Sequence, residues 1–81
     1  MKVLFPMTMK QFIVTCSLDR GSKGVDSFVV ASGNGFVPAF CDWSIRDRCA
    51  WKCNSRSSAE SLIVRTLQAH PNAFDFSIIE L

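Results

Sequence analysis

The last third of the chain, residues 57–81, constrains the fold more than any other stretch because it predicts one helix followed by one strand. A period of 3.6 residues relates the small and apolar positions of its first half, which are Ala59, Leu62, Ile63, Thr66 and Leu67. Arg65 and Gln68 fall on the opposite side. The pattern therefore predicts a helix with one buried face and one solvated face.

Both ends of this helix carry local signals. Ser57 and Glu60 have the S-x-x-E spacing of a capping box, in which the serine hydroxyl accepts a hydrogen bond from the Glu60 amide. At the other end His70 precedes Pro71, and the residue before a proline disfavours the helical conformation. These signals predict a helix over residues 58–69, with His70 as its C-terminal cap.

Residues 74–79 alternate between apolar and polar side chains and predict a strand after the helix. A lone strand cannot satisfy its backbone, so it needs neighbours. Residues 10–18, 25–32 and 36–41 have the composition of three further strands. An Asn-Gly pair before the third is typical of a hairpin turn, and Pro38 places that strand at an edge or a bulge.

The fold class that follows is α+β. We expect an antiparallel sheet of four strands, or five if residues 50–54 also join it, packed on one face against the single helix of residues 58–69. The elements follow in the order β-β-β-(short turn or strand)-α-β. An exposed edge near Pro38, or at the strand of residues 10–18, would leave room for a dimer.

Length and composition predict one small domain. The chain has 81 residues, 48% of them apolar, and a formal net charge of +2, which does not demand a polyanionic ligand. We assign residues 1–9 to a poorly specified N-terminal extension, with Met1, Met7 or Met9 as the start, and residues 10–81 to the domain. The first apolar run is too short for a signal peptide or a membrane span. We therefore expect a cytoplasmic protein.

The four cysteines are Cys16, Cys41, Cys49 and Cys53. In a reducing cytosol all four are expected to be thiols, whereas in an oxidising compartment they would form two disulfides with three alternative pairings. Cys16 is in phase with the apolar face of its strand and is most simply a core residue. The spacing of the other three, with or without His70, matches no common zinc finger but leaves zinc binding open. We predict no metal site and no cofactor.

The least regular segment, residues 42–56, carries the candidate binding residues. Two tryptophans and four basic side chains gather there, namely Trp43, Trp51, Arg46, Arg48, Lys52 and Arg56. Trp and Arg are enriched at the hot spots of protein interfaces, and basic groups among aromatic rings also suit single-stranded nucleic acid. Asp42 and Asp47 interrupt the basic run and argue against nucleic acid. A third interpretation is purely structural, with tryptophans partly in the core and arginines on a solvated rim.

Part of the chain resembles small proteins encoded by phages and mobile elements. The resemblance spans residues 35–81 and is carried by Gly35-Phe36-Val37, Trp43-Ser44, Ala50, Ser57, Ala59-Glu60 and Ile79-Glu80-Leu81. Those proteins share an aromatic hairpin, a Trp-Ser/Thr pair, a short turn ending in Ala, a short strand, a Ser-x-x-x-Ala helix and a final strand. Cys53 departs from the pattern, because an aromatic residue often stands there. Members of the anti-CRISPR and other anti-defence kinds typically bind a host protein and block it.

No catalytic arrangement stands out, and we predict that the protein is not an enzyme. His70 is the only histidine, and neither a nucleophile elbow nor a Gly-rich phosphate loop is present. The resemblance implies an inhibitor that binds a bacterial defence protein or ribonucleoprotein of the CRISPR-Cas type and blocks it sterically. The predicted contact residues are Phe36, Trp43, Arg46, Arg48, Trp51, Lys52 and Arg56. The alternative is a small nucleic-acid-binding or regulatory protein that uses residues 43–56.

Overall fold

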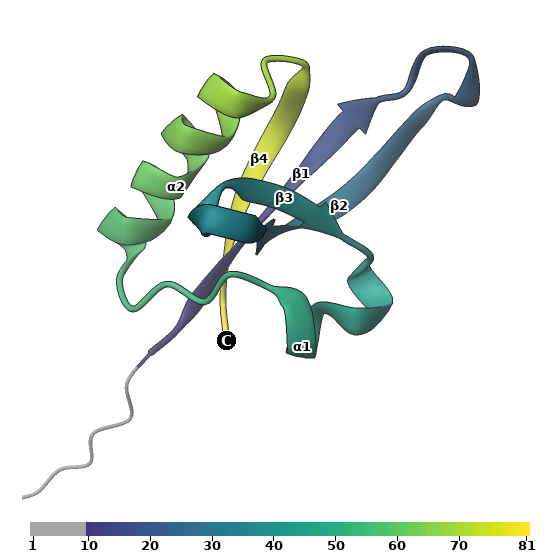
Figure 1. Ribbon diagram of the computed structural model, residues 1–81. Coiled ribbons are helices and arrows are strands. Elements are labelled where there is room, and N and C mark those ends of the chain that lie inside the picture. The colour runs from purple at the N-terminus through teal and green to yellow at the C-terminus, as the bar shows by residue number, and fades with distance from the viewer. Residues whose placement is uncertain (1–9) are drawn as a thin grey trace, which may run out of the picture.

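Four antiparallel strands and one long helix make up residues 10–81, the part of the chain that the computed structural model describes (Figure 1). The strands are β1 (Phe12–Asp19), β2 (Val25–Ser32), β3 (Pro38–Cys41) and β4 (Ala73–Glu80). The helices are α1 (Arg46–Cys49) and α2 (Arg56–Ala69), with the 3-10 turns η1 (Gly21–Lys23), η2 (Asn34–Phe36) and η3 (Trp43–Ile45). The predicted α+β class is confirmed. The predicted extension and the alternative starts lie outside the described residues.

β1 lies inside the sheet. The strands are ordered β3-β2-β1-β4, and β1 pairs antiparallel with β2 on one side and with β4 on the other. Of the two alternatives for an exposed edge, the one at residues 10–18 is therefore wrong. The chain returns after α2 as β4, which pairs with β1. No residue pattern within β1 could have predicted this pairing. β3 is an edge strand, as Pro38 indicated, and β4 is the other edge.

Residues 50–53, which we call the wedge, join the ends of β1 and β2 instead of forming a full fifth strand. β1 and β2 are paired over only part of their length, and the wedge bonds to both where they separate. Phe12 and Cys53 exchange two backbone hydrogen bonds of 2.8 Å each, and the Trp51 amide donates to the Val30 carbonyl at 3.0 Å. The wedge thereby satisfies backbone groups that would otherwise stay unpaired inside the domain.

The core lies between the sheet and α2. Its buried members come from β1, β2, the wedge, α2 and β4, and they are Phe12, Val14, Cys16, Val30, Cys53, Ala59, Leu62 and Ala73. Phe12, Val14 and Cys16 alternate along β1 and share its inner face, and the prediction that Cys16 is a core residue is confirmed. In α2, Thr66 is fully buried and its hydroxyl donates to the Leu62 carbonyl at 2.7 Å. Leu67, which was predicted to face inward, is 40% exposed.

The helix begins two residues earlier than predicted. Ser55, in extended conformation, caps α2 through its hydroxyl, which accepts a hydrogen bond from the Ser58 amide at 3.0 Å. The predicted capping box of Ser57 and Glu60 is therefore wrong, because Ser57 already belongs to the first turn. Three serines lie within four positions, and tertiary packing selects the first as the cap. The C-terminal end at Ala69 agrees with the prediction.

Because Ser55 is the cap, alanine substitutions at Ser55 and at Ser57 should lower the free energy of unfolding by different amounts. We expect Ser55→Ala to lower the free energy of unfolding by about 1 kcal/mol, because the Ser58 amide loses its acceptor. Ser57→Ala should change it by only a few tenths of a kcal/mol, since alanine is favourable within a helix. Urea unfolding followed by circular dichroism measures both. A larger loss for Ser57→Ala would contradict the observed cap.

Candidate functional site

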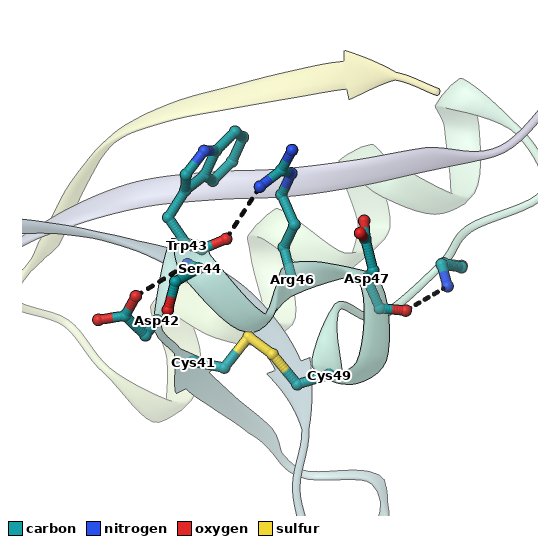
Figure 2. Close-up of a disulfide and its surroundings, with 8 residues drawn as sticks. Cys41, Asp42, Trp43, Ser44, Arg46, Asp47 and Cys49 are labelled. Carbon is teal, nitrogen blue, oxygen red and sulfur yellow. Dashed lines mark hydrogen bonds between the residues drawn. A yellow bond between two sulfur atoms is a disulfide. The ribbon is translucent and has the colours of Figure 1, made fainter.

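A disulfide between Cys41 and Cys49 closes the irregular segment after β3 into a loop (Figure 2). We call residues 41–49 the disulfide loop. The expectation of four thiols is wrong, because only Cys16 and Cys53 are free. The physical reason is the reversal of the chain through η3 and α1, which brings the two Cα atoms to 6.4 Å, within the usual range for a disulfide.

The disulfide loop lies on the face of the sheet away from α2. Cys41 pairs with Val29 across β2 and β3, whereas the adjacent Val30 packs into the core beneath α2. Successive residues of a strand point to opposite faces, so Cys41 and Val29 share the other face. η3 and α1 contact β2 there, and Val29 is fully buried. The loop thus covers Val29 on this face of the sheet.

Hydrogen bonds fix the shape of the disulfide loop, because neither η3 nor α1 contains a buried residue. The Asp42 carboxylate accepts a hydrogen bond from the Ser44 amide at 2.8 Å, and this bond lowers the pKa of Asp42 below its ordinary value. The Lys52 ammonium donates to the Asp47 carbonyl at 3.0 Å and so ties the wedge to α1. These hydrogen bonds and the disulfide hold the loop in place, whereas the long helix and the strands are held by buried side chains.

Trp43 and Arg46 form a stacked pair on this loop. The guanidinium carbon of Arg46 lies 4.6 Å from the centre of the Trp43 ring, and its Nη1 donates to the Trp43 carbonyl at 3.1 Å (Figure 2). Trp43 remains 44% exposed and Ile45 39% exposed. The exposed Arg48 follows one turn later. We use the name loop face for the apolar and guanidinium side chains that this loop carries, which are those of Trp43, Ile45, Arg46 and Arg48.

Trp51 belongs to a different surface. It packs against the core beneath α2, with its ring 6.4 Å from that of Phe36 and 4.9 Å from the guanidinium carbon of Arg65. Arg65 also donates to the Phe36 carbonyl at 2.6 Å. Phe36 is 71% exposed and has a positive φ of 59°, which is unusual for a residue other than glycine. The surface is hollowed beside this cluster, over about 340 Å³ between Trp51 and the first turns of α2.

The predicted contact residues therefore do not form one surface. Trp43, Arg46, Arg48 and Lys52 lie with the disulfide loop, Phe36 and Trp51 lie on the side of α2, and Arg56 lies over the Phe12 ring at 5.7 Å. The alternation of the wedge explains the split, because Trp51 and Cys53 pack on the side of α2 while Lys52 between them reaches α1. Arg65 was predicted only to be solvated, since its partner Phe36 is 29 residues away in the chain.

His70 has a structural contact. Its Nε2 lies 3.0 Å from the Pro38 carbonyl oxygen, and its ring meets the Phe40 ring edge-on at 4.6 Å, so the side chain joins the end of α2 to β3. Two of the three cysteines considered for zinc are consumed by the disulfide. Within residues 10–81 no group of His, Cys, Asp or Glu is placed to hold a metal ion. None of the helices in that range is long and apolar enough to cross a membrane.

The disulfide loop should depend on its covalent bond. We expect Cys41→Ser/Cys49→Ser to lower the free energy of unfolding by about 2–3 kcal/mol, the loop-closure value for a short cross-link. Amide hydrogen exchange in residues 42–50 should accelerate while α2 keeps its protection, because the loop has no buried residue of its own. Reductant should have the same effect on the wild type and none on the double variant. Unchanged exchange in the loop would contradict this account.

The pairing of the cysteines is also directly measurable. Burial raises the pKa of the Cys16 thiol to about 11 and also raises the pKa of Cys53. The thiolate is the reactive form, so at about pH 8 the native protein should resist alkylation. After unfolding without reductant, mass spectrometry should find labels on Cys16 and Cys53 alone. A label on Cys41 or Cys49 before reduction would refute the observed pairing.

Comparisons with known proteins give no information on this site, so its description rests on the geometry alone. No protein-family model matches the chain, and no curated protein or solved structure matches it either. The candidate site is therefore defined by what the structure places together. It is a disulfide-closed loop, aromatic and cationic, on the sheet face away from α2.

Proposed function

We propose that this protein is a small binding protein that docks on another protein through the loop face. The observation that carries the proposal is that Trp43 and Ile45 stay exposed although a disulfide and several hydrogen bonds hold their backbone. Ordering a flexible loop costs free energy on binding, and a loop that is already ordered avoids most of this cost. Trp and Arg are also the residues most enriched among interface hot spots.

The chemistry of the loop face defines the partner surface. Trp43 and Ile45 require an apolar pocket, and Arg46 and Arg48 require carboxylates at its rim. An apolar pocket with an acidic rim is therefore the complement that fits.

The partner that we propose is a bacterial defence protein or ribonucleoprotein of the CRISPR-Cas type, which the bound protein would block sterically. Support comes from the sequence resemblance over residues 35–81, a range that includes the whole disulfide loop. Steric inhibition requires a rigid surface and no reacting group, and the loop face meets that requirement. Inhibition, rather than catalysis, is accordingly the activity that we propose.

Single-stranded nucleic acid is the weaker alternative. Stacking of successive bases needs aromatic rings along one groove. Trp43 lies with the disulfide loop, whereas Trp51 lies beneath the side of α2 that carries Arg65. The two rings therefore offer no shared track, and this separation favours a protein partner.

A cytoplasmic partner would meet the loop under reducing conditions, in which disulfides are rare. The hydrogen bonds of Asp42 with Ser44 and of Arg46 with Trp43 join residues two and three positions apart in the chain. We propose that the protein acts in the cytoplasm of the bacterial host and that reduction weakens docking without abolishing it. Binding measured with and without reductant tests this part separately.

The docking surface can be tested with a matched pair of variants. We expect Trp43→Ala/Arg46→Ala to weaken binding to the captured partner about 30-fold or more, the loss typical of an interface hot spot. Phe74→Ala removes an aromatic side chain of similar exposure from β4 and should leave binding unchanged. Calorimetric titration measures both variants, after circular dichroism has verified their folding.

The identity of the partner needs a separate readout. Wild-type protein expressed in bacteria with an active CRISPR-Cas system should raise the plating efficiency of a targeted phage, and the double variant should not. No protection in any defence system tested would refute the proposed partner. Equal binding of the wild type and the double variant would refute the proposed surface.

A further inference from the structure

We propose that a second copy of this chain binds at the free edge of β4, so that the two sheets join into one antiparallel sheet. This inference concerns a different surface from the loop face and does not rest on the proposed function. It follows from three features of the structure: a closed edge at β3, an open and self-complementary edge at β4, and an apolar stripe of α2 above that edge.

The edge at β3 is poorly suited to pairing. β3 has only four residues and begins with Pro38, which has no amide hydrogen to donate. The Pro38 carbonyl already faces the His70 ring nitrogen at 3.0 Å. A short strand with such obstacles is a usual protection against edge-to-edge association.

Among residues 10–81, no comparable obstacle lies on the second half of the β4 edge. Leu81 donates its amide to the Gln11 carbonyl at 2.8 Å, and Ile79 is paired with Ile13. In an antiparallel pair alternate residues exchange hydrogen bonds, so Ser77 and Ile79 bond to β1. The intervening residues therefore direct their amide and carbonyl groups away from β1, toward the free edge; they are Phe76, Ile78 and Glu80.

This free edge is symmetric about Ile78. The pairing of β1 with β4 shifts in register between Thr15 and Ser17, and Asp75, with a positive φ of 55°, interrupts the regular strand there. Only residues 76–80 thus remain regular. When two such segments run antiparallel, Ile78 lies opposite Ile78 of the partner subunit. Each backbone amide that points outward then meets an outward carbonyl of the other segment.

The charges allow this register. Phe76 faces Glu80 of the partner subunit, and Asp75 faces Leu81 of the partner subunit. No two like charges therefore lie directly opposite each other, an arrangement that would destabilise the pairing. Lys10 lies 3.6 Å from Glu80 within one subunit and offsets its charge near the joint. A second copy is accordingly the occupant that this edge fits.

The helix adds an apolar contact above the joined strands. α2 lies along β4 in Figure 1, and its Arg65 side is turned toward Phe36. Ile63 and Leu67, one helical turn apart, lie on the other side of α2, where Ile63 is half-buried and Leu67 is exposed. A two-fold axis at Ile78 places the two α2 helices on the same face of the sheet. It also accounts for the exposure of Leu67, which the sequence pattern assigned to the buried face.

Sedimentation analysis of the full chain tests the inference. We expect wild-type protein at high micromolar concentration to have twice the chain mass of 9.0 kDa and to dissociate on dilution. Glu80→Pro should give a monomer, because it removes an amide hydrogen that points away from β1 and leaves the pairing of β1 with β4 intact. Leu67→Glu, on the helix surface, should also give a monomer. Val64→Glu, on the outermost side of α2, is the matched control and should remain a dimer.

Amide hydrogen exchange provides the second readout. The amides of Phe76, Ile78 and Glu80 should become protected as the protein concentration rises, while those of Ser77 and Ile79 should be protected at every concentration. A wild type that stays monomeric would overturn the proposal. So would a dimer that persists in both Glu80→Pro and Leu67→Glu, since another surface would then hold it.

Discussion

The backbone pairing of the wedge with β1 and β2 is the constraint on which the rest of the molecule depends. The two hydrogen bonds between Phe12 and Cys53, with that of Trp51 to Val30, hold an irregular segment inside the sheet. Because side chains alternate along an extended segment, this pairing sends Trp51 to the side of α2 and Lys52 to the side of α1. It thereby positions both the start of α2 and the end of the disulfide loop. The disulfide loop and the cluster around Trp51 therefore lie on opposite sides of the wedge.

Local periodicity predicted the parts of the fold that local interactions determine. The stripe of Ala59, Leu62 and Thr66 predicted α2 and its buried face, and the phase of Cys16 in its strand predicted its place in the core. The cap was misplaced because several serines near Ser55 have equal intrinsic ability to cap, and only the path of the chain selects one. The central place of β1 was missed since it depends on pairing with β4, more than 50 positions later in the sequence.

The candidate site was predicted by composition and misjudged in geometry. A cluster of Trp and Arg between residues 43 and 56 indicated a binding segment, but composition contains no information on which face each side chain takes. The cysteine count left four thiols and two disulfides open, and the structure shows an intermediate state with one disulfide and two thiols. The contact of Arg65 with Phe36 and Trp51 joins three separate elements, so no spacing rule could have found it.

The two proposed surfaces are compatible, and their geometry links them. The disulfide loop is attached at β3 and contacts β2, whereas the proposed joint is at β4, at the opposite edge of the sheet. A two-fold axis perpendicular to the sheet would place both α2 helices on one face and both disulfide loops on the other. A dimer would then present two loop faces in the same direction. Simultaneous engagement of two sites on one partner assembly raises the overall affinity far above that of a single site, provided that their spacing matches. A repetitive partner, such as a protein filament on a nucleic acid, would satisfy that condition, whereas a partner with a single site would gain nothing from the dimer.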